Sequence, residues 1–255
     1  MIKHLMTLLF ALIILPGAQA GNYKGRLEWL EKVQLRVLES GIIKKMDVTV
    51  GQFVKKGSVL LVMDQREAKA RLDEAAARLE RSRLGTEDAK REYVRTKELF
   101  DRGLIAEEEL KDAELKKAIA TADEATAKAN LVARQVALDY TTLRAPFNGI
   151  ILQRNVWEGD VIYKNQQQKP ALVLAPSGQM LVRVLVKADV LRKYKKGQAV
   201  DLIIQRKHFK GYVYSLGVES VRIDPGGAVY EMDIVFNRDN RVPLRQAEVA
   251  EVNLP

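Results

Sequence analysis

The chain has 255 residues, of which 47% are hydrophobic and 29% charged, a globular rather than a disordered composition. Its formal net charge is +9 and it contains no cysteine, which excludes a disulfide framework and a lipoprotein anchor. Aromatic residues make up only 6% of the chain, so several small modules fit better than one large core.

Residues 1–20 have the form of an export signal. Lys3 precedes an apolar run from Leu5 to Leu15, and Ala18-Gln19-Ala20 supplies small residues for a cleavage site. This order is typical of a secretory signal peptide, and the run is short for a membrane span. We expect an exported chain that begins near Gly21 and resides in a bacterial periplasm, so we expect no nucleic-acid partner. An uncleaved membrane anchor is the alternative.

Residues 41–64 read as short strands joined by glycine turns. Lys44 to Val50 alternates in part and Val59 to Met63 is continuously apolar, so both predict strands. Gly51 and Gly57 stand where tight turns are needed. A segment of this size cannot bury a core alone.

Residues 65–142 are charged, rich in alanine and free of proline, which predicts two long helices. In the first helix, small, apolar or hydroxylated residues recur at alternating spacings of four and three, which is a heptad seam. The seam positions are Ala68, Leu72, Ala75, Leu79, Ser82, Thr86, Ala89, Tyr93, Thr96 and Phe100.

The return helix runs from about Glu107 to Tyr140, and its expected seam has the same spacing. The seam positions are Leu115, Ala118, Ala122, Ala125, Ala129, Val132 and Val136. Gly103, between the helices, can take the left-handed conformation that ends a helix. Each helix of roughly 35 residues spans on the order of 50 Å at 1.5 Å per residue, so a long hairpin is expected.

Residues 143–175 repeat the pattern of 41–64. Pro146 and Gly149 mark a turn before an apolar run, and Gly159-Asp160 turns the chain before Val161. Together the two segments can form a small β-sandwich, with the helical hairpin in place of one edge turn. Beyond residue 176, alternating segments and the turn Asp224-Pro225-Gly226-Gly227 predict a small antiparallel barrel.

The two halves resemble the split biotinyl-lipoyl domain of the periplasmic adaptor proteins, also called membrane fusion proteins, of tripartite efflux systems. The residues that carry the resemblance are Gly41, Val50-Gly51, Val54 to Gly57, Leu60 to Asp64, Leu143 to Gly149, Gly159 to Val161 and the run at Leu172. The combination of both halves around a heptad hairpin is specific, whereas either half alone is a weak signal.

The resemblance implies a mixed α and β, elongated, multi-domain fold. A long antiparallel α-helical hairpin (65–142) is inserted in a split biotinyl-lipoyl-like β-sandwich (41–64 and 143–175). A small antiparallel β-barrel (176–255) follows. The N-terminal segment 21–40 supplies a strand to this barrel, around Trp29 to Leu38. Because the chain ends at Pro255, we expect little material for a membrane-proximal domain.

The resemblance also implies a function. The chain is expected to be an adaptor that links an inner-membrane transporter, of the resistance-nodulation-division or ATP-driven type, to a TolC-like outer-membrane channel. Copies are expected to pack side by side as a homo-oligomer. Such a protein is not an enzyme and uses no cofactor.

The resemblance places partner binding at the hairpin tip. Adaptors that dock TolC-like channels show an Arg, a Leu four residues on, and a Ser seven beyond that. Arg95 and Leu99 match, and Ala106 stands at the serine position; the turn adds Gly103 and Leu104. The alternative is that Leu99 flanks the hairpin core and Arg95 is only solvated.

No catalytic constellation is apparent in the sequence. The only histidines are His4 and His208, and with no cysteine a typical zinc site is not expected. The basic stretch 206–210 reads as a solvated loop, with a membrane-surface or partner contact as the alternative.

Two other functional hypotheses stay open. The first is a covalent carrier of lipoate or biotin, for which Lys44-Lys45-Met46 is a superficial match. True carriers modify a lysine at the turn between the halves, which the helical hairpin occupies here. The second is a self-assembling periplasmic scaffold whose hairpin only oligomerises.

Overall fold

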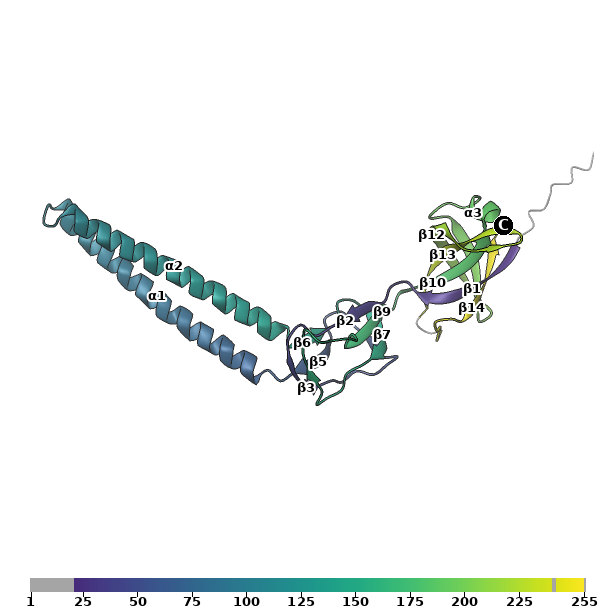
Figure 1. Cartoon of the computed structure of the whole chain (residues 1–255), viewed down its shortest axis with the longest axis horizontal. Helices are drawn as coiled ribbons and strands as arrows, with labels where there is room; N and C mark the ends of the chain where they lie inside the picture. The colour runs from purple at the N-terminus through teal and green to yellow at the C-terminus, as the bar shows by residue number, and fades with distance from the viewer. Residues whose placement is uncertain (1–20, 240–241, 255) are drawn as a thin grey trace, which may run out of the picture. The chain divides into compact units, whose positions relative to one another are not determined.

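The computed structural model describes residues 21–239 and 242–254, and Figure 1 shows their helices and strands. The expected signal segment 1–20 lies outside the described residues. Contacts divide the chain into two compact units. One is residues 31–177, and the other joins the segment up to Leu30 to the segment from Gly178 onward.

Six strands of the second unit close into an antiparallel barrel in the order β1-β10-β13-β12-β11-β14 (Figure 1). These strands are β1 (Gly21–Trp29), β10 (Gln179–Lys187), β11 (Ala199–Ile204), β12 (Lys207–Asp224), β13 (Gly227–Asn237) and β14 (Val249–Leu254). The short helix α3 (Ala188–Leu191) follows β10.

The barrel core follows from alternation, because successive side chains of a strand point to opposite faces. Every second residue of β14 is buried, namely Ala250, Val252 and Leu254. On β1, Gly25 is needed for a close approach, since a Cβ there would lie 2.4 Å from Cγ1 of Val182. A larger residue would push β1 away from β10.

The prediction of a barrel strand around Trp29 to Leu38 was wrong in its position. The barrel strand is β1, which ends at Trp29, whereas Val33–Leu35 form β2 and pair with β9 (Leu172–Pro176) in the other unit. The alternation of β1 was a weak signal, because its inward positions include Gly25 in place of an apolar side chain.

The first unit contains two four-stranded sheets, in the orders β2-β9-β7-β4 and β6-β5-β3-β8. Besides β2, these strands are β3 (Gly41–Lys45), β4 (Phe53–Val54), β5 (Val59–Met63), β6 (Thr142–Arg144), β7 (Gly149–Arg154), β8 (Val161–Ile162) and β9 (Leu172–Pro176).

Each sheet combines strands from before and after the hairpin. Phe53 on β4 pairs with Ile150 on β7, and Gly41 on β3 pairs with Ile162 on β8. The shared core holds fully buried side chains from both halves, namely Ile43, Leu60, Leu61, Met63, Ile151, Leu172 and Leu174. Neither half could bury this surface alone.

Gly149 has a different role from the one its turn position suggested. It is the first residue of β7, and a Cβ there would lie 2.6 Å from the carbonyl oxygen of Ala175. Glycine is therefore needed because β9 approaches closely. At Gly51 and Gly57, by contrast, φ is +86° and +82°, a left-handed conformation that glycine adopts without steric cost.

The hairpin consists of α1 (Arg66–Asp101) and α2 (Glu107–Asp139), which pack along each other (Figure 1). The predicted seam of α1 is confirmed, because all ten of its positions are buried or half-buried. Of the other α1 residues, only Glu87 and Leu99 are not exposed. The helix runs through Gly85 without a break.

The predicted seam of α2 was wrong. All seven of its positions are exposed, including Leu115 at 59% and Val132 at 57%. The less exposed positions with heptad spacing are Leu110, Ala113, Lys117, Ala120, Glu124, Ala127, Leu131 and Leu138. Most lie two residues beyond the predicted ones, which is a rotation of about 200° at 3.6 residues per turn.

Polar contacts hold the hairpin to the sandwich at its base. The side-chain amide of Gln65 donates to the hydroxyls of Thr141 and Thr142, at 2.9 and 3.0 Å. Arg66 donates from Nη2 to the Asp64 carboxylate at 2.6 Å. This hydrogen bond, together with the backbone N–H of Arg66, lowers the pKa of Asp64 to about 2.

Candidate docking site at the hairpin tip

The tip is a tight turn between α1 and α2. The N–H of Gly103 donates to the carbonyl of Phe100 at 2.8 Å, and that of Leu104 to the carbonyl of Leu99 at 3.0 Å. These bonds end α1, and Gly103 has the left-handed φ of +72° that this ending requires. The turn leaves Leu104 65% exposed, so an apolar side chain faces solvent at the tip.

Arg95 and Leu99 lie one helical turn apart on α1, so they share a face leading to the tip. Arg95 is exposed and its guanidinium forms an ion pair with Glu92 at 2.5 Å. Exposed pairs of this kind contribute little to stability, so Arg95 can exchange Glu92 for another acceptor at small cost. Leu99 is half-buried and contributes to both the hairpin core and the surface.

Ala106 is the N-cap residue of α2 and provides no side-chain hydrogen bond. Glu107, Glu108 and Glu109 fill the first turn, where the helix dipole favours negative charge. The tip thus combines exposed Leu104, the Arg95 guanidinium and three carboxylates in one short stretch. The structure brings Leu99 and Leu104 together directly, whereas Ala106 begins the opposite helix.

A second feature of the hairpin is an apolar stripe on α2 that faces away from α1. We call it the outward stripe and define it as Leu115, Ala118, Ile119, Ala122, Ala125, Ala129, Val132 and Val136, all exposed. Seven of these residues were identified in the sequence but assigned to the wrong side of the helix. An exposed stripe with heptad spacing is suited to packing against another helix.

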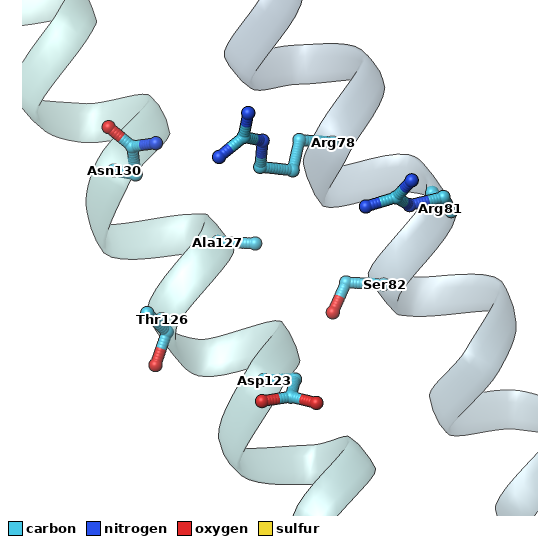
Figure 2. A pocket seen from close by; sticks show the side chains of 7 residues that line it. All are labelled: Arg78, Arg81, Ser82, Asp123, Thr126, Ala127 and Asn130. Atoms are coloured by element: carbon cyan, nitrogen blue, oxygen red, sulfur yellow. The ribbon is translucent and has the colours of Figure 1, made fainter.

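The shaft of the hairpin also contains a polar groove of about 360 Å³. Figure 2 shows Ser82 on α1 and Ala127 on α2 facing each other, with Arg78 reaching into the gap between the helices. The groove exists because the facing side chains of Ser82 and Ala127 are small. Because the lining mixes arginines with Asp123 and Asn130, the groove does not select for one sign of charge.

Within residues 21–239 and 242–254, no cluster of three His, Asp or Glu side chains is placed to hold a metal ion. In the same part of the chain, no helix is both long and apolar enough to cross a bilayer. The Lys44-Lys45 pair lies on β3, where Lys45 is salt-bridged to Asp47 at 2.5 Å.

A model of the CzcB-like barrel-sandwich hybrid domain matches residues 31–169, which is more than half of the chain. The chain belongs to this family. The match spans both halves of the sandwich and the hairpin between them, the same elements on which the resemblance to membrane fusion proteins was based.

Relatives of this chain are named as export and efflux proteins. The macrolide export protein MacA of Escherichia coli O157:H7 is 30% identical over 204 residues, covering 73% of this chain and 55% of MacA. The efflux pump periplasmic linker BepF of Brucella suis is 25% identical over 228 residues, covering 87% and 56%. The chain thus spans about half the length of these curated relatives.

A solved structure shows a similar fold at low sequence identity. The membrane fusion protein Spr0693 of Streptococcus pneumoniae R6 has a TM-score of 0.71 at 16% identity, covering 92% of this chain and 99% of that one. This likeness concerns the fold alone. The family match and the relative MacA confirm the recognition, made from the sequence, of a membrane fusion (periplasmic adaptor) protein.

Proposed function

We propose that this protein is the adaptor subunit of an efflux complex, linking an inner-membrane transporter to a TolC-like outer-membrane channel. The observation that carries the proposal is the hairpin tip, where Arg95, Leu99 and Leu104 stand at the end of two helices of 36 and 33 residues. Helices of this length exceed what the sandwich needs for its own core.

The proposed domain organisation follows the family. Residues 41–64 and 143–175 form a split lipoyl-like sandwich, 65–142 the hairpin, and 176–255 with the N-terminal strand the barrel. The protein is exported by its signal segment to the periplasm and is associated with the inner membrane through its partners. Its role is mechanical rather than enzymatic.

At the tip, each proposed docking residue has a distinct part. The Arg95 guanidinium offers several fixed donors to carbonyl or carboxylate groups of the channel, in place of Glu92. Leu99 and exposed Leu104 supply apolar contact area. Gly103 permits the sharp turn, and Ala106 leaves a small surface at the start of α2.

We further propose that copies of the chain pack side by side through the outward stripe. Its alanines allow close approach of a second helix, while Leu115, Ile119 and Val132 supply apolar area. Such a ring of hairpins would seal a conduit between transporter and channel. The stripe equally favours the scaffold hypothesis, in which self-association is the whole function and the tip is inert.

Export in a strain that depends on this protein tests the proposal. A macrolide is the first substrate to test, because the relative MacA is a macrolide export protein. Arg95→Glu with Leu99→Asp should abolish export while the folded protein accumulates normally. Arg91→Glu with Leu84→Asp is a matched control on exposed positions of the same helix and should leave export unchanged. Equal export by both double variants would favour the scaffold.

A further inference from the structure

Strand β12 continues past the end of β11 as an edge strand that pairs with β13 alone, and the two strands are joined by a turn. The pairing of β12 with β11 ends at Tyr212, and β10 pairs with β13 only from Val229 onward. We call residues 214–228 the β12–β13 extension. Among the described residues, the free side of β12 in this extension has no partner strand, whereas its β13 partners from Val229 onward also pair with β10.

The extension exposes branched apolar side chains. Val218 is 93% exposed, Ile223 is 80% exposed and Val221 is 53% exposed, whereas Val213 in the barrel part of the same strand is buried. Tyr212 and Tyr214 are also exposed where the extension leaves the barrel. Apolar groups in such positions do not contribute to the core, and a cluster of them marks an interaction site.

Two lysines lie beside the extension. The ammonium of Lys187 lies beside the turn, because a Cβ on Gly226 would be 2.4 Å from its Nζ. Lys196 lies over the ring of Tyr214, with Nζ 5.6 Å from the ring centroid. Between Lys187 and Lys196 in the sequence, the loop after α3 carries three more exposed cations, Arg192, Lys193 and Lys195.

The balance of charge in this region is positive. Segments 187–196 and 218–224 contain six Lys or Arg residues against three carboxylates, those of Asp189, Glu219 and Asp224. Asp224 is paired with Arg222 at 3.1 Å. The basic turn at 206–207 is separate, since it lies at the other end of β12.

We propose that the β12–β13 extension binds the surface of an anionic lipid bilayer. Val218, Val221 and Ile223 would enter the boundary between headgroups and acyl chains, with Tyr212 and Tyr214 at the interface. Lys187 and the basic loop would bind lipid phosphates. Apolar area and cationic charge act together at such surfaces.

A bilayer fits this surface better than an added β-strand from a protein partner. Strand addition needs a regular ladder of free backbone groups along an edge. Here the β12 ladder has three register irregularities between Val213 and Arg222. Such bulges interrupt pairing at an exposed edge. The inference goes beyond the adaptor role, and a vesicle assay tests it without transporter or channel.

The absence of cysteine makes a site-specific probe possible. Val218→Cys in the full chain, labelled with a polarity-sensitive fluorophore, is mixed with vesicles of phosphatidylglycerol and phosphatidylcholine. A blue shift with increased intensity is expected on these vesicles and not on phosphatidylcholine alone. The matched probe Lys210→Cys, at the other end of β12, should show no shift.

Charge variants test the electrostatic part by vesicle co-sedimentation. Lys195→Glu with Lys196→Glu should lower the affinity for anionic vesicles at least about tenfold, as expected from the loss of two basic groups at the surface. Lys207→Glu with Lys210→Glu changes the net charge by the same amount at the other end of β12. This variant should lower the affinity for anionic vesicles much less. Comparing variants of the full chain holds any contribution of residues 1–20 constant.

Three outcomes would overturn the proposal. One is no shift of the 218 probe on anionic vesicles. Another is an equal loss of affinity in both double-charge variants, since that indicates attraction by net charge alone. The third is vesicle binding by Val218→Asp with Ile223→Asp at the affinity of the unmodified chain. If those aspartates abolish export but vesicle binding never occurs, the surface contacts a protein instead.

Discussion

The hydroxyl of Thr86 on α1 donates a hydrogen bond to the backbone carbonyl of Ala120 on α2, at 2.9 Å. Thr86 is only 1% exposed, so this bond lies inside the helix pair. Two turns further along α1, Tyr93 receives the ammonium of Lys117 over its ring, 3.9 Å from the centroid. Both contacts join the same two faces and set the register of the hairpin.

Replacing Thr86 by valine should therefore weaken the hairpin. The side chain keeps its shape and branching but loses the bond to Ala120, so the free energy of unfolding should fall by about 1 kcal/mol. Thr126→Val is the matched control, because the Thr126 hydroxyl bonds only to Ala122 of its own helix. Urea unfolding of both variants measures the difference, and equal stability would contradict the interhelical role.

The two faces of α2 should respond differently to the same substitution. Ala113 is buried at the seam, so Ala113→Asp places a charge between the helices and should destabilise the hairpin by about 2 kcal/mol or more. Ala122 lies on the outward stripe, so Ala122→Asp should change stability by no more than about 0.5 kcal/mol beyond helix propensity. Circular dichroism melts measure both variants. A larger destabilisation by Ala122→Asp than by Ala113→Asp would indicate that α2 packs through the face predicted from sequence.

Ala122→Asp should instead reduce self-association, if the outward stripe joins copies of the chain. Sedimentation velocity measures this, with Ala76→Asp as a control on an exposed position of α1. Loss of association in both variants would indicate that added negative charge, rather than the stripe, is responsible.

The start of α2 can be strengthened at Ala106. Serine there would cap the helix, and with Glu109 three residues on it completes a capping box. We expect Ala106→Ser to raise the free energy of unfolding by about 1 kcal/mol, measured by thermal melts. Ala106→Val is the control, since valine cannot cap and should give no gain. A destabilised serine variant would show that the turn geometry excludes the cap.

Asp64 provides a pH test at the base of the hairpin. Because Arg66 lowers its pKa to about 2, from an ordinary value of 3.8, the pair stabilises the fold above about pH 4. This contribution is lost as the pH falls through about 2. A carboxyl-carbon NMR titration should find the midpoint near 2, and Arg66→Gln should raise it. A midpoint near 3.8 in the unmodified protein would contradict the pairing.

The seam of α1 could be predicted from sequence, but the seam of α2 could not. Along α1, charged side chains occupy most positions outside the seam, so only one face is suitable for burial. Along α2, alanines and aliphatic residues occur on two faces. The face that packs on α1 includes the half-buried charged residues Lys117 and Glu124, and the Lys117 ammonium lies over the ring of Tyr93. A pattern of residue types cannot reveal this.

The position of the barrel strand and the docking site likewise could not be predicted from local sequence patterns. Gly25 is inward-facing because β1 closes against Val182, a contact between residues far apart in sequence. At the tip, the pattern of Arg95, Leu99 and Ala106 was found only through the family resemblance, since none of these residues has a distinctive local signal. The exposed β12–β13 extension was missed, because its apolar residues read as an ordinary strand.

The central claim is that the hairpin tip meets an outer-membrane channel. The most direct test is a photo-crosslinking amino acid at position 104 in living cells, with position 84 as a control on an exposed part of α1. We expect a crosslinked product with a TolC-like channel from position 104 and none from position 84. Crosslinks from position 104 to other copies of this chain alone, in well-expressed protein, would contradict it.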